Sequence, residues 1–223
     1  KPVSDHVQAV ANYYELFLDY HRSARVIAEE MLLEDKMPPV AVLIVPQARF
    51  LAPEVQNSLL GYARNGGIVI TEGRVGEFDN YGQPADTLFQ TLNVVPAFTD
   101  LRTLTVGGVA LPVPDSDSVF SPAGSGDILA AFGPAPAALS APFGRGRVVF
   151  LGFNPGLHRY AAFPAILENI FGNLGLTPRF MVSDPKLVLR EWRHGRDTYL
   201  ILASRADTWA LQEATVKVRG RVE

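Results

Sequence analysis

Apolar residues recur at helical spacing near the start of the chain. Between Asp5 and about Tyr20 they fall every three or four positions, as expected for a helix with one buried face. Ser4 or Asp5 is placed to cap this helix. The predicted buried stripe consists of Val7, Val10, Ala11, Tyr14, Phe17 and Leu18. The pattern therefore predicts an amphipathic helix that packs on the rest of the chain.

Two short runs of aliphatic residues flank a second helical pattern. Residues 40–45 (VAVLIV) and 67–71 (GIVIT) are apolar on both faces, which is typical of strands in the middle of a parallel sheet covered by helices. Pro53 stands at a favoured first helical position, and Gly66 suits the end of that helix. Strand, helix and strand in this order form a parallel crossover unit. The prediction is an α/β fold with three layers.

Shorter patterns continue to about residue 178. Residues 24–28 form a β-prone run, and residues 115–126 are rich in Ser, Asp, Gly and Pro, which predicts a mobile surface loop. The remaining predictions are a loop over 75–83, a helix over 86–92, a hairpin around Gly107–Gly108, strands over 128–132, 137–141 and 147–153, and a helix over 161–174.

The character of the sequence changes beyond Pro178. Strand-like runs occupy 187–192, 198–202 and 214–218, without a helical period. We expect residues 1–183 to form the α/β domain and residues 184–223 to begin a small antiparallel β-domain. Because Lys1 is preceded by no initiator Met and no signal segment, we expect a fragment of a longer protein.

Composition narrows the possible functions. The 223 residues are 48% hydrophobic and 19% charged, which is typical of a soluble globular chain. Twenty Lys and Arg against 23 Asp and Glu give a net charge of -3, without the basic surplus that nucleic acids require. No cysteine is present, so disulfides and thiol nucleophiles are excluded. The longest uncharged stretch, 128–144, is interrupted by prolines and too short to span a membrane, and the cellular compartment stays open.

Several of these segments together resemble a known family. Val42 to Gly73 (VLIVPQARFLAPEVQNSLLGYARNGGIVITEG) and Gly144 to Gly156 (GRGRVVFLGFNPG) resemble the middle, or trimerisation, domain of family 42 β-galactosidases and related glycoside hydrolases. Leu189 to Ser204 and Val216 to Gly220 resemble the small β-domain that follows it. The resemblance implies a flavodoxin-like, class I glutamine amidotransferase-like fold with a mostly parallel sheet. It also implies a structural role: the domain would either hold subunits together or form part of the wall of the active site in a catalytic barrel.

The chain departs from that family in two respects. The family domain opens with a β-strand before its first helix, whereas Lys1 to Ser4 offers only a stub, so a central strand is missing, replaced or contributed differently. The barrel with the two catalytic carboxylates has no room in 223 residues. We therefore expect no catalytic residue in this chain, and expect its partners to be its own barrel and other subunits.

The amidotransferase-like fold places a nucleophile directly after a strand. Here that strand is 67–71, which puts Glu72 near the elbow, with Phe153 to Gly156 at the position of the family's histidine motif. Neither a cysteine nor a histidine occupies these positions, so amidotransfer is excluded. A stand-alone hydrolase with a carboxylate at the elbow stays open as an alternative.

Polar residues gather at the predicted strand ends, where open α/β sheets commonly bind ligands. A carbohydrate or small-molecule pocket here would be lined by Arg49, Glu72, Arg74, Asn154 and His158. The plainer interpretation, which we favour, is a surface ion pair between Glu72 and Arg74, with His158 exposed in a loop. Two aromatic residues outside the predicted buried stripe, Tyr13 and Tyr20, are candidates for an interface with another subunit or the barrel.

Cofactor and metal sites have little support in the sequence. Gly144 to Arg147 lacks the Lys and Ser/Thr of a phosphate loop and leads into a strand, so we interpret it as a hairpin turn. The four histidines share no ligand spacing. The aspartates at 115, 117 and 127 lack the glycine and closing glutamate of a calcium loop. No cofactor and no metal are predicted.

Overall fold

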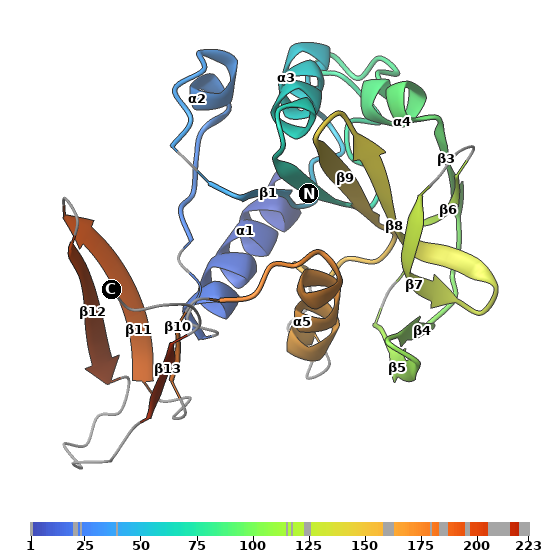
Figure 1. Ribbon diagram of the computed structural model, residues 1–223. Helices are drawn as coiled ribbons and strands as arrows, with labels where there is room; N and C mark the ends of the chain where they lie inside the picture. The colour runs from blue at the N-terminus through green and yellow to red at the C-terminus, as the bar shows by residue number, and fades with distance from the viewer. Residues whose placement is uncertain are drawn as a thin grey trace.

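The computed structural model (Figure 1) describes most of the chain. The described residues are 2–19, 22, 24–38, 40–114, 116, 118–122, 126–157, 163–178, 180–182, 187–194, 197–204 and 215–218. Among them, no helix is long and apolar enough to cross a membrane.

A seven-stranded sheet forms the centre of the molecule. Its spatial order is β1 (Val42–Val45), β2 (Ile68–Glu72), β9 (Gly146–Leu151), β8 (Ala135–Phe143), β7 (Asp127–Phe132), β4 (Thr103–Val106) and β5 (Val109–Pro112). β1, β2 and β9 run parallel, and every other neighbouring pair in this sheet is antiparallel. The prediction of a mostly parallel sheet is therefore wrong. The direction reverses because the tight turn at Gly144 (φ 62°) and Arg145 joins β8 to β9 as a hairpin, as the sequence suggested.

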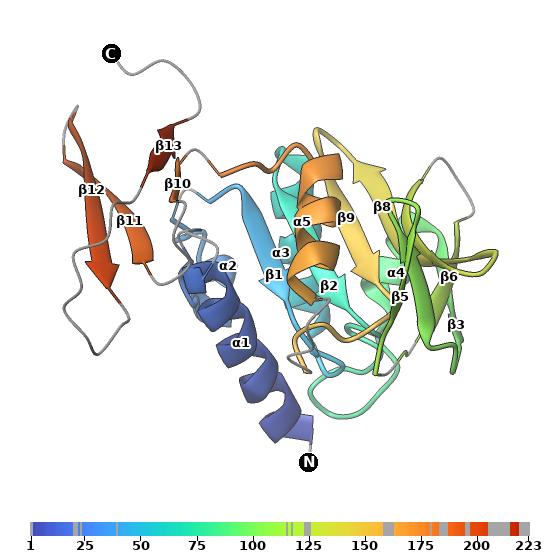
Figure 2. The ribbon, with the colours of Figure 1, turned by 90° about the horizontal axis from the view of Figure 1, so that it is seen from below.

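Helices cover both faces of the parallel half of the sheet (Figure 2). On one face, α1 (Pro2–Asp19) and α5 (Phe163–Asn173) pack over Ile70 and Val149. On the other, α3 (Pro53–Arg64) and α4 (Thr87–Leu92) pack over Val69 and Val148. Adjacent residues of β2 and β9 thus enter opposite cores, as strand geometry requires. The predicted α/β architecture with three layers is present in this half.

A two-stranded ribbon was missed in the sequence. β3 (Val94–Phe98) pairs antiparallel with β6 (Ser118–Pro122), within the segment that we predicted as a mobile surface loop. Phe120 of β6 is 1% exposed, and its ring lies against Phe89 and Phe150. The surrounding segment is polar in composition, so the sequence did not reveal that Phe120 is buried and that its packing stabilises the strand. That loop prediction is therefore wrong for 118–122.

The N-terminal third also differs from the prediction at three places. Among the strands that the structure describes, β1 lies at the edge of the sheet and pairs only with β2, although its apolar sequence predicted an interior strand. Residues 24–28 form no strand, and they lead into a short helix, α2 (Glu29–Leu33), that was not predicted. In α1 the buried face is rotated, because Tyr13 is 3% exposed whereas Tyr14 is 38% exposed.

The C-terminal strands form a small antiparallel group. β10 (Phe180–Val182) pairs with β13 (Val216–Val218), and β11 (Leu187–His194) pairs with β12 (Asp197–Ser204). Phe180, Val182 and Leu189 make a separate small core. An antiparallel tail agrees with the sequence pattern. Asp184 lies outside the described residues, and the division at 183/184 stays a prediction.

Candidate functional site at the strand ends

The carboxyl ends of the three parallel strands, β1, β2 and β9, lie together and contact α1. Glu72 is the last residue of β2, Gln47 follows β1, and Asn154 follows β9. The crossover topology places these ends at one edge of the sheet, where α/β proteins build their sites. We call Gln47, Glu72 and Asn154, with Asn12 and Tyr13 of α1, the strand-end cluster.

Glu72 is the centre of this cluster. Its side chain is 1% exposed, and Oε1 accepts hydrogen bonds from the Tyr13 hydroxyl at 2.6 Å and the Gly156 backbone N–H at 2.7 Å. The Gln47 amide donates to Asn154 Oδ1 at 2.5 Å and reaches Glu72 Oε2 at 3.5 Å. A buried carboxylate with this many donors is held in one orientation. It is bound within the fold and is not presented to solvent.

The remaining bonds attach α1 and the loop after β9 to the same point. Asn12 donates to the Gly156 carbonyl at 2.8 Å. Gly156 has no room for a side chain, because an added Cβ would lie within 3.0 Å of Glu72 Oε2 and 2.9 Å of the Ala9 Cβ. Gln47 has a φ of 50°, a left-handed conformation uncommon for a residue other than glycine. The cluster therefore fastens α1 to the strand ends.

The structure brings together only some of the predicted pocket residues. Glu72 and Asn154 share the strand-end cluster, so the interpretation of Glu72 as a surface residue paired with Arg74 is wrong. Arg74 and Arg49 instead both bind Glu77, at 2.8 Å and 2.5 Å. His158 and Tyr20 lie outside the described residues, and the roles predicted for them stay predictions.

Arg49 and Arg74 belong to a second, more exposed group. The Arg49 guanidinium lies 5.4 Å from the centre of the Phe78 ring, which stacks on Phe50 at 5.4 Å. Phe50 is 47% exposed. We call Arg49, Phe50, Arg74, Glu77 and Phe78 the aromatic–arginine patch. It presents an apolar ring beside planar charged groups, a composition common at protein interfaces.

Three residues that organise this region were not singled out in the sequence. Gln56 is fully buried on α3, where its amide donates to the carbonyls of Leu51, Gly76 and Ala85, and its oxygen accepts from the Leu88 N–H. It thereby holds the loop that carries Arg74 and Glu77. Asn12 and Gln47 act similarly at the strand ends. An uncharged polar residue on the apolar face of a helix was the available signal for Asn12 and Gln56.

The geometry at Glu72 does not form a nucleophile elbow. Gly73 follows with a φ of 60°, and the chain then continues as a loop, with the next helix beginning only at Thr87. Glu72 itself is not among the described residues with positive φ. The strand, strained turn and helix that an elbow needs are therefore not combined here.

Tyr13 occupies a different place from that predicted. Its burial and its bond to Glu72 put it on the inner side of α1, so the prediction that it faces outward to a partner is wrong for this side chain. The partly exposed aromatic residue of this turn is Tyr14. The polar bonds of Asn12 and Tyr13, which hydrophobic spacing does not reveal, decide which face of α1 turns inward.

The chain folds as a mixed α/β domain with a cluster of buried polar side chains at the ends of its parallel strands. Residues 29–120 match the family model described as "GLMA-like, second domain". No curated protein sequence matches the chain.

The solved structures that share this fold include three β-galactosidases. Gan42B, a GH42 β-galactosidase from G. stearothermophilus, superposes with a TM-score of 0.72 and 15% identity, over 96% of this chain and 32% of that one. The enzyme from Bacillus circulans sp. alkalophilus gives 0.65 and 15%, over 89% and 31%. The cold-adapted enzyme from Rahnella sp. R3 gives 0.65 and 15%, over 94% and 35%.

These matches confirm the resemblance to a GH42 domain at the level of the fold. The chain spans about a third of the length of each of these three enzymes. Most of this chain therefore superposes on one part of each of these longer chains.

Proposed function

We propose that this chain is a non-catalytic domain of a β-galactosidase-like glycoside hydrolase whose catalytic barrel lies elsewhere in the parent polypeptide. The observation that carries the proposal is the coverage: 96% of this chain superposes on 32% of a GH42 β-galactosidase. The strand-end chemistry agrees with it. The carboxylate nearest the elbow position is buried and accepts hydrogen bonds from Tyr13 and Gly156, which supports a structural role for it.

Its role in the parent protein would be architectural. A domain of this kind supports a barrel or a neighbouring subunit through its surface, and the aromatic–arginine patch is the surface we assign to that contact. Phe50 is 47% exposed, and ion pairs with Glu77 hold the side chains of Arg49 and Arg74 in place. Pre-positioned aromatic and arginine side chains contribute most of the energy in many interfaces. Oligomerisation through this surface belongs to the same proposal.

The proposal is tested on the parent polypeptide. Phe50→Ala combined with Arg49→Ala is expected to lower the assembly state in light scattering, or to change β-galactosidase activity, while the domain stays folded. Tyr81→Ala is a matched control, because Tyr81 is an aromatic residue on the neighbouring loop that is 90% exposed. Hydrolysis of a nitrophenyl β-galactoside by this chain alone, abolished by Glu72→Gln, would overturn the non-catalytic assignment.

A carbohydrate-binding role is the second candidate. The specific observation in its favour is the half-exposed Phe50 ring beside Arg49 and Glu77, since an aromatic face next to hydrogen-bonding groups suits a sugar ring. Galactose titrated into the chain is expected to shift the NMR signals of Phe50 and its neighbours at millimolar concentration. Unchanged spectra would remove this candidate and leave the architectural role intact.

A further inference from the structure

The sequence contains a single Asn-Gly pair, Asn65–Gly66, and it lies directly after α3. Both residues are exposed. They occupy the corner where α3, the beginning of β2 and the hairpin between β8 and β9 meet, because the Arg145 N–H donates to the Arg64 carbonyl at 3.0 Å. A chemical change at this pair would therefore act on three elements together.

The side chain of Asn65 is not held by the described part of the chain. Asn65 bonds there through its backbone, since its N–H donates to the Gly61 carbonyl at 3.1 Å and its carbonyl accepts from Arg145 Nη2 at 3.2 Å. The following residue, Gly66, has no side chain to shield its nitrogen. An added Cβ on Gly66 would meet one atom within 4 Å, the Arg145 Cβ at 3.9 Å. The side-chain carbonyl carbon of Asn65 can thus approach the Gly66 nitrogen without steric hindrance.

One hydrogen bond opposes that approach. The Gly66 N–H donates to the Ala63 carbonyl at 3.0 Å, and a nitrogen in this bond is turned away from the Asn65 side chain. The bond belongs to the last turn of α3, at an exposed helix end. Helix ends open locally at a small fraction of the free energy of global unfolding. Opening of this one turn is therefore enough to free the Gly66 nitrogen.

We propose that Asn65 is a covalent modification site, at which opening of the end of α3 lets the Gly66 nitrogen displace the side-chain amide as ammonia. The Gly66 N–H gives its proton to water, and the nitrogen forms a bond to Asn65 Cγ while the bond from Cγ to the side-chain nitrogen breaks. The product is a five-membered succinimide. One water molecule then opens the ring at either carbonyl, giving aspartate or isoaspartate, without oxidation or reduction.

The two products differ in their effect on the corner. Isoaspartate lengthens the backbone by one carbon, and there is no space to absorb it, since a Cβ on Gly146 would already overlap the carbonyl oxygens of Gly67 and Ala63. Aspartate keeps the backbone length. Its carboxylate is unfavourable at the end of a helix, but it lies near the Arg145 guanidinium, which has no ion pair with the described residues. Isoaspartate should therefore destabilise the domain, and aspartate should be tolerated.

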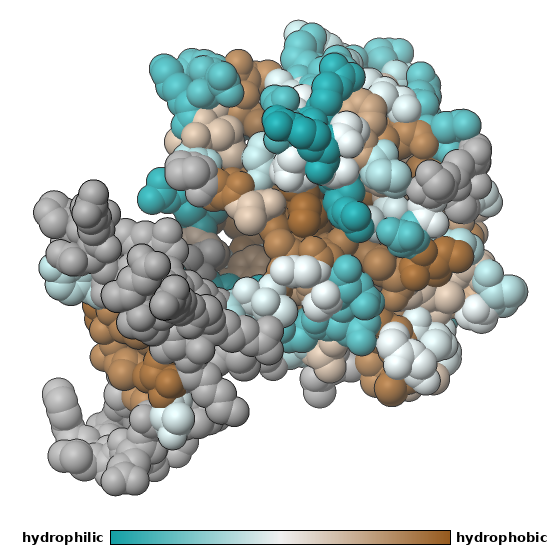
Figure 3. Space-filling model, viewed as in Figure 1, coloured by the Kyte–Doolittle hydropathy of each residue, from teal (hydrophilic) through white to brown (hydrophobic). Residues whose placement is uncertain are grey.

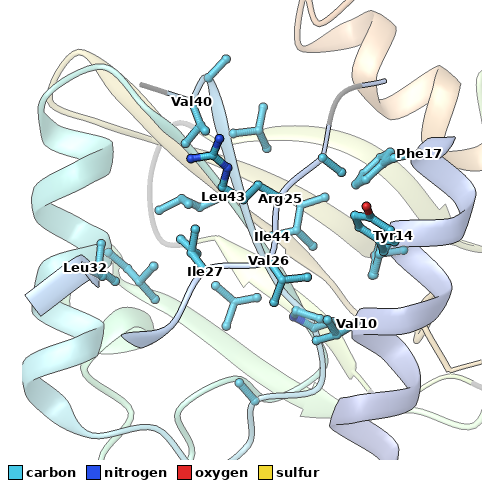
Figure 4. Close-up of a pocket in the computed structure, with 18 of the residues that line it drawn as sticks. Val10, Tyr14, Phe17, Arg25, Val26, Ile27, Leu32, Val40, Leu43 and Ile44 are labelled. Carbon is cyan, nitrogen blue, oxygen red and sulfur yellow. The ribbon is translucent and has the colours of Figure 1, made fainter. Parts of the chain in front are cut away.

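The strain of a longer backbone would extend to β1 through Tyr62. The Tyr62 ring lies against Gly67, and its hydroxyl donates to the Val40 carbonyl at 2.7 Å. Val40 lines an apolar groove of about 640 Å³ beside β1, bordered by α1 and by Leu43 and Ile44 (Figure 4). Figure 3 shows the surface hollowed here, with hydrophobic atoms in its wall. Isoaspartate at position 65 would thus also loosen the beginning of β1.

The test is incubation of the folded chain in warm, mildly alkaline buffer, followed by mass spectrometry of its tryptic peptides. The pair lies in peptide 65–74. Asn57, which is exposed on the same helix and precedes Ser58, lies in peptide 50–64 and is the internal control. We expect peptide 65–74 to convert to the acid, with isoaspartate exceeding aspartate, while Asn57 is unchanged. The chain unfolded in urea should convert at least about fivefold faster, because the Ala63 bond is then absent.

Two variants complete the test. Asn65→Gln should show no conversion, because its longer side chain closes a six-membered ring only slowly. Asn65→Asp, which has the carboxylate on a backbone of normal length, should unfold near the temperature of the unmodified chain, whereas the isoaspartate form should unfold at a lower temperature. The proposal would be overturned by an unchanged Asn65 in the folded chain after the urea-unfolded chain has converted, or by equal conversion of Asn57 and Asn65. An isoaspartate form that unfolds at the same temperature as Asn65→Asp would overturn the structural effect assigned to it.

Discussion

β1 and β2 are two short, mostly aliphatic strands in different surroundings. Both are short aliphatic runs, they are paired in parallel, and Ile44 of one lies in register with Ile70 of the other. β2 has β9 on its far side, and Ile70 is fully buried. β1 has an apolar groove on its far side, and Ile44 is only partly buried. Burial is therefore decided by what lies beside a strand as well as by its own side chains.

The two strands also end differently. β2 ends in Glu72, the centre of the strand-end cluster, whereas β1 is followed by Gln47, whose one close bond is to Asn154. At its closed side the domain satisfies its polar groups within itself. At its open side, within the described part of the chain, it leaves an apolar groove beside β1. The same sheet thus has one strand covered on both sides, β2, and one strand bordered by a groove, β1. Substitutions at equivalent positions of the two strands can compare these surroundings.

The largest expected difference lies at the strand ends. Glu72→Ala leaves the Tyr13 hydroxyl and the Gly156 N–H without an acceptor and should cost about 4 kcal/mol of unfolding free energy. Gln47→Ala, at the end of β1, should cost only about 1 kcal/mol. Urea denaturation measures both. Glu72→Gln keeps the shape and one acceptor, so an intermediate cost is expected even if Glu72→Ala does not fold. Equal effects at the two positions would contradict the contrast.

The next effect is at the beginning of β9, where Gly146 lets two backbone segments approach closely. A Cβ on Gly146 would overlap the carbonyl oxygens of Gly67 and Ala63, so Gly146→Ala should destabilise the domain by about 3 kcal/mol. Gly61→Ala on α3 is the matched control, since an added Cβ there meets nothing within 4 Å. It should stabilise by about 0.5 to 1 kcal/mol through helix propensity. Thermal unfolding of both variants should therefore shift in opposite directions.

The sequence predicted the parts of this fold that depend on local pattern. The helices near 5–20 and 53–66, the strands near β1 and β2, and the hairpin at Gly107–Gly108 are confirmed by the structure, with small differences in their ends. The predictions that were wrong concern features that depend on residues distant in the chain. The edge position of β1 and the lack of a strand over 24–28 reflect the open groove, which no local pattern contains.

The candidate site was predictable only in part for the same reason. Glu72 and Asn154 could be placed together, because strand ends of a parallel sheet converge. The pairing of Arg49 and Arg74 with Glu77 depends on the path of the loop held by Gln56, and the burial of Tyr13 depends on the bond that it donates to Glu72. These are contacts between polar groups, and hydrophobic spacing carries no information about them.

The direct comparison of the two strands uses the register pair. Ile70→Ala should cost about 3 kcal/mol, because its fully buried side chain leaves a cavity. Ile44→Ala should cost about 1 kcal/mol, since Ile44 borders an existing groove. Denaturant midpoints at unchanged slope measure this difference of about 2 kcal/mol. A cost at Ile44 that already equals that at Ile70 in this chain would show that the groove is closed in solution.

The smallest effect concerns the beginning of both strands and depends on pH. Tyr62 of α3 donates to the Val40 carbonyl at 2.7 Å, just before β1, and its ring lies against Gly67, just before β2. Burial raises the pKa of Tyr62 above its ordinary value of 10.0. The folded state therefore favours the neutral phenol, and this contribution to stability is complete below pH 10 and is lost as the pH rises through the raised pKa.

Tyr62→Phe should cost about 1 kcal/mol of unfolding free energy at neutral pH, through the lost hydrogen bond. The gap between the two unfolding free energies should narrow above pH 10, because only the protein with Tyr62 loses stability by ionising it. A gap that stays constant from pH 8 to pH 11 would show that the phenol ionises as freely in the folded domain as in the unfolded chain.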